Sequence, residues 1–481
     1  MRRDNQVLLS DIYEECLDLL DNEKPKFLSL LENLIDFAEF IPQSFYLAYH
    51  RHFGRNREYP LTAFISALIF QKILTIPTDS LLITILQMSK ELRDFCGFFN
   101  RRGASAVPDA SKFTRFKQDF LPFLKEMFDK LVDYTEPICR AIDKALADIL
   151  IYDTSGVEAY VTENNPKYVN SLIKKLKSAY SDNPDVDPYK MAYGLMPSHA
   201  SADTAIKQMY INGHFCYAHK FGLVTNGLGI IRHVDFLDDD FKAAHPEVVV
   251  EKKSDHPDED KSIGDSTSLQ PVLSDFFTAH PQLSYGTFLG DSAFDKGDHY
   301  TFLRDTCGFK KVLIPLNSRN SSDLPPVGYN EFGYPLCPND NSLAMKYCGL
   351  TKEKGRTDRV KWCCPKLSIV KGNRTCACEK PCSSALFGRT AYTYADRDFR
   401  MLPGIARDSE EWDNLYKIRC VTERTINHFK SNMCVANRKS RDRTTAKSDL
   451  LFAAIAQLFT VILAHKLSRP KLFRSFKRLI A

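Results

Sequence analysis

The sequence lacks a long uninterrupted apolar run. Its first 20 residues do not resemble a signal peptide, because acids interrupt them at Asp4, Asp11, Glu14, Glu15 and Asp18. The most apolar stretch, residues 450–464, is 15 residues long and contains Gln457, short of the roughly 20 residues that span a bilayer. We therefore expect a cytoplasmic protein without a membrane partner, in which this stretch is a buried helix.

The chain also lacks a strong excess of charge of one sign. Its 65 Lys and Arg against 60 Asp and Glu leave a net charge of +5, and 44% hydrophobic with 26% charged residues excludes a wholly disordered or fibrous chain. A length of 481 residues suggests about three domains. The charge is uneven, because residues 401–481 hold 16 basic and 7 acidic residues. This basic region predicts a polyanion contact there.

Gly and Pro are scarce in residues 9–135, where apolar residues recur at helical spacing. Within this helical region, residues 108–123 begin like a capped helix with Phe113, Phe116 and Phe120 on one face. Lys112 and Arg115 lie on the other face. Two interpretations stay open: the second helix of a helix-turn-helix with its basic face against DNA, or an amphipathic packing helix.

The pattern changes to mixed α/β after Ala141. We expect a buried strand ending near Asp153, two strands joined by a turn at Asn226-Gly227, a helix over residues 265–279, a strand ending near Asp291, and one more strand over residues 310–317. This order of elements predicts a mixed sheet with helices.

Residues 318–403 lack histidine and the paired CxxC spacing of a regular zinc ribbon, yet they hold seven of the 14 cysteines. In a protein that is not exported, thiols or metal ligands are favoured over a disulfide framework. The candidate ligands of an all-thiolate structural zinc site are Cys363, Cys364, Cys376, Cys378 and Cys382. Reduced thiols without metal are the alternative.

Residues 409–433 predict a helix that opens at Ser409 with acids in its first turn. At about 100° per residue, four polar side chains share an arc of about 60° beside the apolar stripe: Tyr416, Arg419, Glu423 and Lys430. An Arg–Glu pair four residues apart is common on helix surfaces. A solvated face and a functional site are therefore both open at this point.

The spacing Tyr416-x2-Arg419-x3-Glu423-x6-Lys430 resembles the YREK signature of insertion-sequence DDE transposases. Asp153 and Asp291 precede it in the order in which that family keeps its first two catalytic aspartates. The helical N-terminal third is also similar to the N-terminal domain of such transposases. The resemblance implies an α/β, RNase H-like mixed sheet core interrupted by a cysteine-rich insertion and preceded by an all-helical N-terminal domain.

The implied boundaries follow from these segments. They are a DNA-binding helical domain (1–140), the first part of the core (141–317), the insertion (318–404), the second part of the core with the Glu helix (405–465) and a basic tail (466–481).

The resemblance further implies that Asp153, Asp291 and Glu423 are catalytic and hold two Mg²⁺ ions. Carboxylates suit this ion because it prefers hard oxygen ligands. Arg419 and Lys430 would bind phosphates, and Tyr416 the transposon end. The basic tract at residues 437–447, with Arg438 and Lys439, would add phosphate contacts, unless it is a solubilising loop.

The implied activity is cleavage of the element's terminal inverted repeats and their joining to target DNA. It implies a homodimer in the synaptic complex, located in the bacterial cytoplasm with the nucleoid. A catalytically inactive, transposase-derived DNA-binding protein is the alternative, and a zinc scaffold for protein partners is a third.

Other acids compete for the catalytic roles. Asp235 and Asp238 to Asp240 form an acidic patch at a strand end and are the strongest competitors. We expect Asp295 to cap the helix after Asp291, and Glu158 to belong to the strand after the one that carries Asp153.

Overall fold

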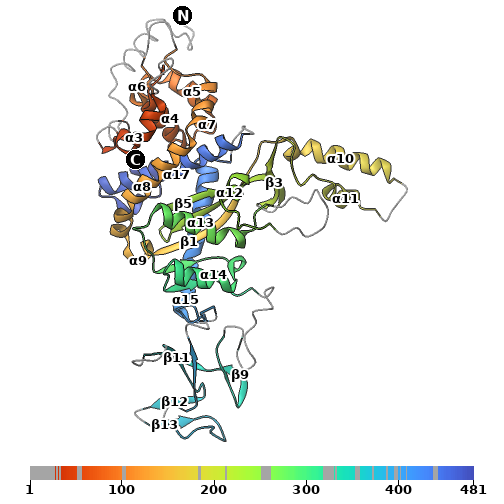
Figure 1. Ribbon diagram of the computed structural model, residues 1–481, viewed down its shortest axis with the longest axis vertical. Helices are drawn as coiled ribbons and strands as arrows, with labels where there is room; N and C mark the ends of the chain where they lie inside the picture. The colour runs from red at the N-terminus through yellow and green to blue at the C-terminus, as the bar shows by residue number, and fades with distance from the viewer. Residues whose placement is uncertain are drawn as a thin grey trace, which may run out of the picture. The chain divides into compact units, whose positions relative to one another are not determined.

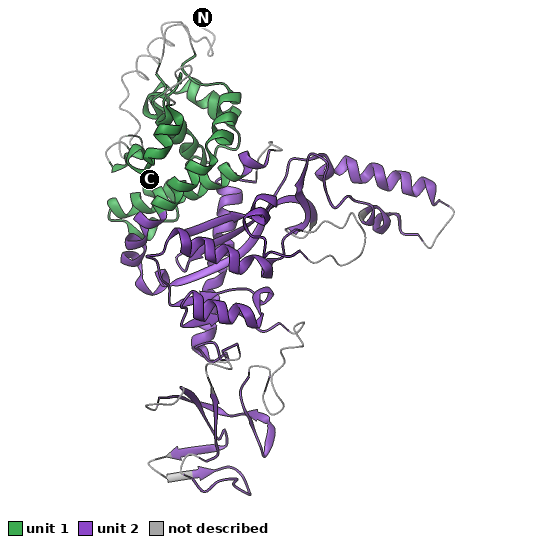
Figure 2. Cartoon of the chain, viewed as in Figure 1, with its two compact units in different colours: residues 1–131, 447–481 green, residues 132–446 purple. Residues whose placement is uncertain are grey.

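A computed structural model describes residues 28, 31, 34–50, 57–99, 105–181, 186–211, 214–250, 262–317, 330, 333–352, 358–370, 373–385, 388–394, 399–400, 402–407, 409–436 and 442–480. The chain divides into two compact units, residues 1–131 with 447–481 (unit 1) and residues 132–446 (unit 2; Figure 2). The C-terminal 35 residues therefore group with the N-terminal helices, whereas the sequence suggested a core segment reaching residue 465 and a separate tail.

Unit 1 is helical in its described elements, as the periodicity predicts. These are η1 (Phe37–Phe40), α3 (Gln43–Tyr49), α4 (Leu61–Ile73), α5 (Asp79–Met88), α6 (Lys90–Cys96), α7 (Ala110–Asp119), α8 (Leu121–Ile142, continuing into unit 2), η8 (Pro470–Leu472) and α18 (Phe476–Ile480), with most of α17 (Arg443–Lys466). Side chains cap several of the helix starts; for example, Thr78 accepts from Leu81 N, and Asp109 accepts from Ser111 N and Lys112 N.

Aromatic rings fill the core of unit 1. Phe64 stacks on Phe116 with centroids 4.8 Å apart, and Phe45 contacts Phe120 at 5.5 Å. Phe113 is fully buried. The three phenylalanines predicted on one face of residues 108–123 therefore pack inward, and α7 is an amphipathic helix whose apolar face is in the core.

Helix α17 is long and apolar enough to cross a membrane by length and hydropathy, but 94% of its apolar window is buried inside the protein. Ser448 Oγ donates to Lys117 O at 2.6 Å, and Phe459 contacts Phe37 and Phe40. The predicted buried helix over residues 450–464 is confirmed. A helix that is hydrophobic on all sides is buried on all sides.

Buried charges of unit 1 pair with one another. Lys117, 1% exposed, lies 2.8 Å from both Asp79 and Asp449, and Lys72 lies 3.2 Å from Asp449. An unpaired charge at this depth would be strongly destabilising, so these four side chains are structural partners.

Unit 2 is built on one mixed sheet of seven strands. They are β1 (Ile149–Glu158), β2 (His199–Ala200), β3 (Asp203–Ile211), β4 (His214–Asn226), β5 (Ile231–Phe236), β6 (Thr287–Leu289) and β7 (Lys311–Leu313). The order is β2-β3-β4-β1-β6-β7, and β5 also pairs with β4. β1 runs antiparallel to β4 and parallel to β6, and β6 runs parallel to β7. The predicted turn at Asn226-Gly227 is confirmed, since it joins β4 to β5.

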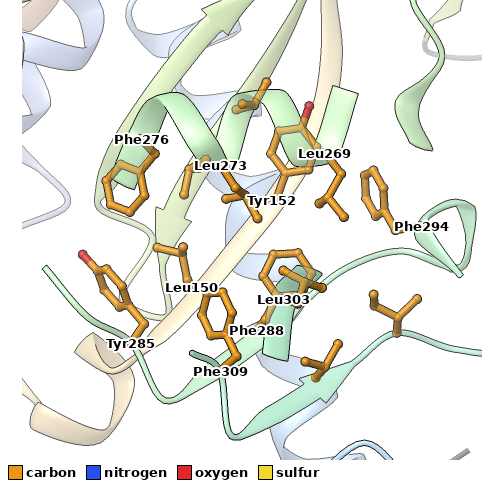
Figure 3. Close-up of a cluster of buried hydrophobic side chains, with 14 of the residues drawn as sticks. Leu150, Tyr152, Leu269, Leu273, Phe276, Tyr285, Phe288, Phe294, Leu303 and Phe309 are labelled. Carbon is orange, nitrogen blue, oxygen red and sulfur yellow. The ribbon is translucent and has the colours of Figure 1, made fainter. Parts of the chain in front are cut away.

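Helices cover both faces of this sheet. On one face, Leu150 and Tyr152 of β1 pack with Leu269, Leu273 and Phe276 of α13 (Asp265–Ala279; Figure 3). On the other face, Ile149 and Ile151 pack with Trp412. Alternate residues of a strand face opposite sides, which explains this division. The remaining helical elements near the sheet are α9 (Lys144–Ala147), α12 (Asp239–Ala244), η3 (Ser292–Phe294), α14 (Gly297–Thr301) and η4 (Phe302–Thr306).

A helical hairpin follows β1 before the chain returns to the sheet. It consists of η2 (Thr162–Asn164), α10 (Pro166–Ala179) and α11 (Pro188–Gly194). In Figure 1, α10 and α11 extend away from the strands at β3.

The cysteine-rich segment (residues 318–404) forms small antiparallel sheets. Its strands are β8 (Leu336–Cys337), β9 (Asp340–Ala344), β10 (Lys346–Thr351), β11 (Arg359–Cys363), β12 (Leu367–Val370), β13 (Asn373–Cys376) and β14 (Thr390–Tyr394). Trp362 is fully buried beside Tyr334 and Val360 in a core of this segment's own.

The chain then returns to the sheet through an irregular helical run. It contains α15 (Glu410–Tyr416), a 3-10 turn η6 (Lys417–Arg419), α16 (Cys420–Asn427) and a π turn η7 (His428–Asn432). Ser409 caps the run by accepting from Trp412 N at 3.1 Å, as predicted. Arg407 holds the return in place by donating to Ile314 O and to the Tyr300 hydroxyl.

Candidate active site

Asp153 lies in the middle of β1, not at its end. The strand continues because β4 keeps pairing with it: Asp153 lies opposite Leu223, and Glu158 lies opposite Ala218. The predicted strand end is therefore wrong by five residues, and Glu158 belongs to the same strand as Asp153. A long antiparallel partner supplies hydrogen bonds past the point at which the apolar run stops.

Asp291 follows β6, the parallel neighbour of β1. Ile151 pairs with Leu289, so Asp153 and Asp291 each come two residues after paired positions on adjacent strands. Asp291 Oδ1 accepts from Ser292 N at 2.6 Å and caps the short helix η3. Because β1 and β6 are parallel neighbours, the two aspartates lie at the same level along the two chain segments.

Glu423 is held against the sheet by its neighbours on α16. The hydroxyls of Thr422 and Thr225 on β4 lie 2.5 Å apart, and both residues are fully buried. Thr425 Oγ1 donates to Gly229 O at 2.8 Å. Gly229 has φ +79°, and a Cβ there would lie 2.5 Å from Val421 Cγ1, so a residue without a side chain lets α16 come this close.

Arg419 connects the helix to the strand. Its Nη1 lies 3.5 Å from Asp153 Oδ2, and its Nη2 lies 2.6 Å from Glu423 Oε1. The guanidinium also lies 6.0 Å from the ring of Tyr416, which stacks on Trp412. One cation therefore contacts carboxylates that are 270 positions apart in the chain.

The electrostatics of Asp153 reflect this grouping. Burial raises its pKa from 3.8 to about 6. Arg419 and the Thr154 N–H oppose the rise, whereas the charges of Asp291 and Glu423 add to it. The three carboxylates are thus close enough for their charges to interact. Burial also raises the pKa of the Tyr416 hydroxyl, and Arg419 opposes that rise.

Lys430 reaches β1 beside Asp153. Its Nζ donates to Ser155 Oγ at 2.8 Å, and burial lowers the pKa of its ammonium group. Residues 153 and 155 share a face of the strand. The sequence reasoning missed Ser155, although the period of two along the strand could have indicated it. It also missed the Thr225–Thr422 contact, for which no local signal exists.

The competing acids lie elsewhere. Val234 of β5 pairs with Leu223 of β4, and Leu223 in turn pairs with Asp153 of β1. Asp235 comes one residue after Val234. Asp235 therefore faces the opposite side of the sheet, where it binds His233 at 2.6 Å. Asp238 caps α12 by accepting from Asp240 N and Phe241 N.

Asp295 is not the helix cap that the sequence suggested. It is fully buried and accepts from Arg400 Nη2 at 2.7 Å and Asn317 N at 2.7 Å. This pair ties the end of the cysteine-rich segment to the sheet. Asp295 is consequently a structural carboxylate.

The donor chemistry of Asp153, Asp291 and Glu423 suits a hard divalent cation, because three mutually repelling carboxylates favour a positive charge between them. Within the described ranges, no group of three or more His, Cys, Asp or Glu side chains is gathered as a metal site requires. Two of the three carboxylates contact Arg419 instead. The charges fit Mg²⁺, and its binding remains a prediction.

One predicted zinc ligand is corrected. Cys363 forms a disulfide with Cys348, so it is not a free ligand. The strands β10 and β11 are antiparallel neighbours in which Cys363 pairs with Lys346, and Cys348 lies two residues after Lys346. Cys364, Cys376, Cys378 and Cys382 are free. Zinc at these four remains a prediction.

The DNA-binding residues predicted outside this site differ in setting. Lys112 pairs with Glu58 at 2.5 Å and lies over the ring of Tyr59, whereas Arg115 is exposed. Arg438 and Lys439 lie outside the described residues. Lys112 and Arg115 belong to unit 1, whereas Asp153, Asp291 and Glu423 belong to unit 2.

Comparison with known proteins gives one match in sequence. Residues 15–119 match the family described as Transposase domain (DUF772). No curated protein matches. Among solved structures, a piggyBac transposase synaptic complex with hairpin DNA aligns over 96% of this chain and 80% of its own, with 11% identity and a TM-score of 0.38.

Proposed function

We propose that this protein is a DDE transposase that cleaves the ends of an insertion sequence and joins the freed 3′-hydroxyl to target DNA. The observation that carries the proposal is the contact of Arg419 with both Asp153 and Glu423. Arg419 and Glu423 belong to the YREK-type pattern, and Asp153 is the first of the two aspartates that precede it. These three residues come from distant parts of the chain and meet at this contact. The match of residues 15–119 to a transposase domain supports the same reading.

The sheet supports an RNase H-like core with a cysteine-rich insertion. The strands β5, β4, β1, β6 and β7 lie in this order, with the first three antiparallel and the last three parallel. Asp153 lies on the central strand of the five, Asp291 follows its neighbour, and Glu423 comes from a helix on one face. The segment between β7 and α15 folds as separate small sheets, as an insertion would.

In this proposal Asp153, Asp291 and Glu423 hold two Mg²⁺ ions, which would activate the attacking oxygen and stabilise the leaving oxygen. The chain's own cations position the strand. Arg419 lies among the carboxylates, and its guanidinium can bind a phosphate oxygen of DNA in place of one of its carboxylate partners. Lys430, directed by Ser155, places a second positive charge farther along β1. Tyr416 presents a partly buried ring for contact with the transposon end.

Because two ends must be held together, we propose a homodimer in the synaptic complex, acting in the bacterial cytoplasm. The test is Mg²⁺-dependent cleavage and strand transfer with DNA carrying the element's own terminal inverted repeats. Asp291→Ala should abolish both reactions. Asp298→Ala is the matched control, since Asp298 is a nearby acid that is 80% exposed. Equal cleavage by the native protein and Asp291→Ala would reject the site, and end binding without cleavage would favour an inactive, transposase-derived DNA-binding protein.

A further inference from the structure

The helical hairpin after β1 carries an unbalanced charge. Helix α10 contains four lysines and no acid, whereas the whole chain has 65 basic and 60 acidic residues. All four side chains are exposed: Lys167, Lys174, Lys175 and Lys177. Ordinary solvated surfaces intersperse both signs of charge. An exposed helix with one sign alone indicates a partner of the opposite sign.

The lysines occupy one side of the helix. Taking Lys167 as zero and about 100° per residue, the four lysines fall within an arc of about 160°. The apolar residues fall within a separate arc of about 100°: Val169, Leu172, Ile173 and Leu176. Leu176 is buried, and α11 packs against α10. The apolar side therefore has its partner within the hairpin, and the basic side is left to the solvent.

The lysines are available for a ligand. In the part of the chain that the structure describes, none of the four forms an ion pair with a carboxylate. Lys177 Nζ donates to the Tyr189 hydroxyl on α11 at 2.8 Å and lies over the same ring. Lys167, Lys174 and Lys175 are the cations that a polyanion would meet first.

The hairpin is rooted firmly in the sheet. Ala159 and Val161 at its start and Ala200 at its end pack against Tyr217 of β4. Asn164 donates to Ala159 O at 2.7 Å and accepts from Tyr217 N at 2.8 Å, and the Tyr217 hydroxyl donates to Pro197 O. Both ends of the hairpin are thus fixed to one strand, which holds α10 in a defined place relative to that strand.

The root lies close to the candidate active site. β1 ends at Glu158, five residues after Asp153, which is about 17 Å along an extended strand. Helix α10 has 14 residues and is about 21 Å long. A duplex rises about 34 Å per turn. Because the root of the hairpin and Asp153 share β1, α10 would meet the phosphates of DNA that flanks the scissile bond.

We propose that the α10–α11 hairpin is an arm that binds the phosphate backbone of duplex DNA next to the cleavage site, through Lys167, Lys174 and Lys175. This inference rests on the proposed function, because it assumes that the carboxylate site works on DNA. The arm holds the duplex without reading its sequence, since ammonium groups contact phosphates and not base edges. Its contribution falls as salt rises, because each phosphate contact releases counterions.

The test measures the affinity of the full-length protein for a labelled duplex of mixed sequence over a range of salt concentrations. Lys167→Gln/Lys174→Gln/Lys175→Gln should reduce the steepness of log Kd against log salt by about 3, and weaken binding at least tenfold at low salt. The triple Arg variant should bind as the native protein does. The matched control removes three exposed lysines of unit 2 that lie outside the arm, Lys144, Lys310 and Lys346, and should leave the slope unchanged.

Acetylation of the native protein, mapped by mass spectrometry, gives a second measurement. DNA should protect Lys167, Lys174 and Lys175, but not Lys144 or Lys310. An unchanged salt slope in the Gln variant, or unprotected arm lysines, would overturn the inference even if the native protein cleaves its element's ends. Arm-dependent binding by a native protein that never cleaves would support the arm and reject the transposase proposal.

Discussion

Arg419 Nη1 lies 3.5 Å from Asp153 Oδ2. Asp153 comes from the central strand of the sheet and Arg419 from the helical run that follows the cysteine-rich segment, so the contact closes the candidate site across 266 positions. The same guanidinium binds Glu423. The positive charge of Arg419 offsets the repulsion between the carboxylates, which is strong because they lie close together and partly buried.

Replacing Arg419 should therefore change both electrostatics and activity. Arg419→Ala should raise the pKa of Asp153 further, because the guanidinium lowers it. It should also slow single-turnover cleavage by about 100-fold, the loss typical of one positioned cationic or hydrogen-bonding group. The cleavage rate of Arg419→Lys should lie between those of the native protein and Arg419→Ala, since lysine keeps the positive charge but not the forked pair of guanidinium donors. An Ala variant that cleaves at the native rate would contradict the phosphate-positioning role.

Asp153 should cost the folded protein stability at neutral and higher pH. The pKa of Asp153 in the folded protein, about 6, lies above the ordinary value of 3.8. The protonated carboxyl group therefore stabilises the folded state fully below about pH 4, and this stabilisation is lost as pH rises through 6. The difference corresponds to about 2–3 kcal/mol. Asp153→Asn should therefore raise the free energy of unfolding at pH 8 in metal-free buffer while abolishing cleavage.

Urea denaturation at pH 4 and pH 8 checks this prediction, because the gain in stability should be much smaller at pH 4. Glu158→Gln, at the exposed end of the same strand, is the control for the removal of a carboxylate from β1. A loss of stability at pH 8 in Asp153→Asn would contradict the raised pKa.

The Thr225–Thr422 contact should position Glu423. Thr422→Val leaves the Thr225 hydroxyl buried without this partner and should lower the free energy of unfolding by about 1–3 kcal/mol, with slower cleavage. Because valine matches the shape of threonine, Thr225→Val/Thr422→Val should recover most of the lost stability. Denaturant unfolding of the two single variants and the double variant measures the coupling, and strictly additive losses would argue against the hydrogen bond.

Variants of Asp295 and Asp291, which are four residues apart, should distinguish a structural carboxylate from a catalytic one. Asp295→Asn removes the fully buried charge that pairs with partly buried Arg400 and should lower the free energy of unfolding by about 3 kcal/mol. Its cleavage rate per folded molecule should remain near the native one. Asp291→Asn should do the reverse, with native stability and no cleavage. Inactive but stable Asp295→Asn would exchange the two assignments.

The cysteine-rich segment should contain one disulfide. Peptide mapping without reduction should recover Cys348 linked to Cys363, and Cys363→Ser should leave Cys348 open to alkylation. Zinc at the free cysteines Cys364, Cys376, Cys378 and Cys382 would appear in metal analysis of the reduced protein and be lost in Cys378→Ser. Recovery of Cys363 as an alkylated thiol in the native protein would contradict the disulfide.

Local patterns predicted much of the architecture. The helical unit, the buried apolar helix, the helix at residues 265–279 and the turn at Asn226 follow from periodicity and turn residues, which act over a few positions. The end of β1 was misplaced because pairing with β4 carries the strand past its apolar run. The helix capping expected of Asp295 was wrong because Arg400, 105 positions away, fixes its role.

The sequence by itself determined the candidate residues of the proposed site, since the order and spacing of Asp153, Asp291, Arg419, Glu423 and Lys430 can be read along one chain. The tertiary structure alone decided which of them meet. Strand register turns Asp235 to the opposite face from Asp153, and the return of the chain after the cysteine-rich segment brings Arg419 to Asp153. Such contacts depend on pairing and packing between distant segments, and no local pattern encodes them.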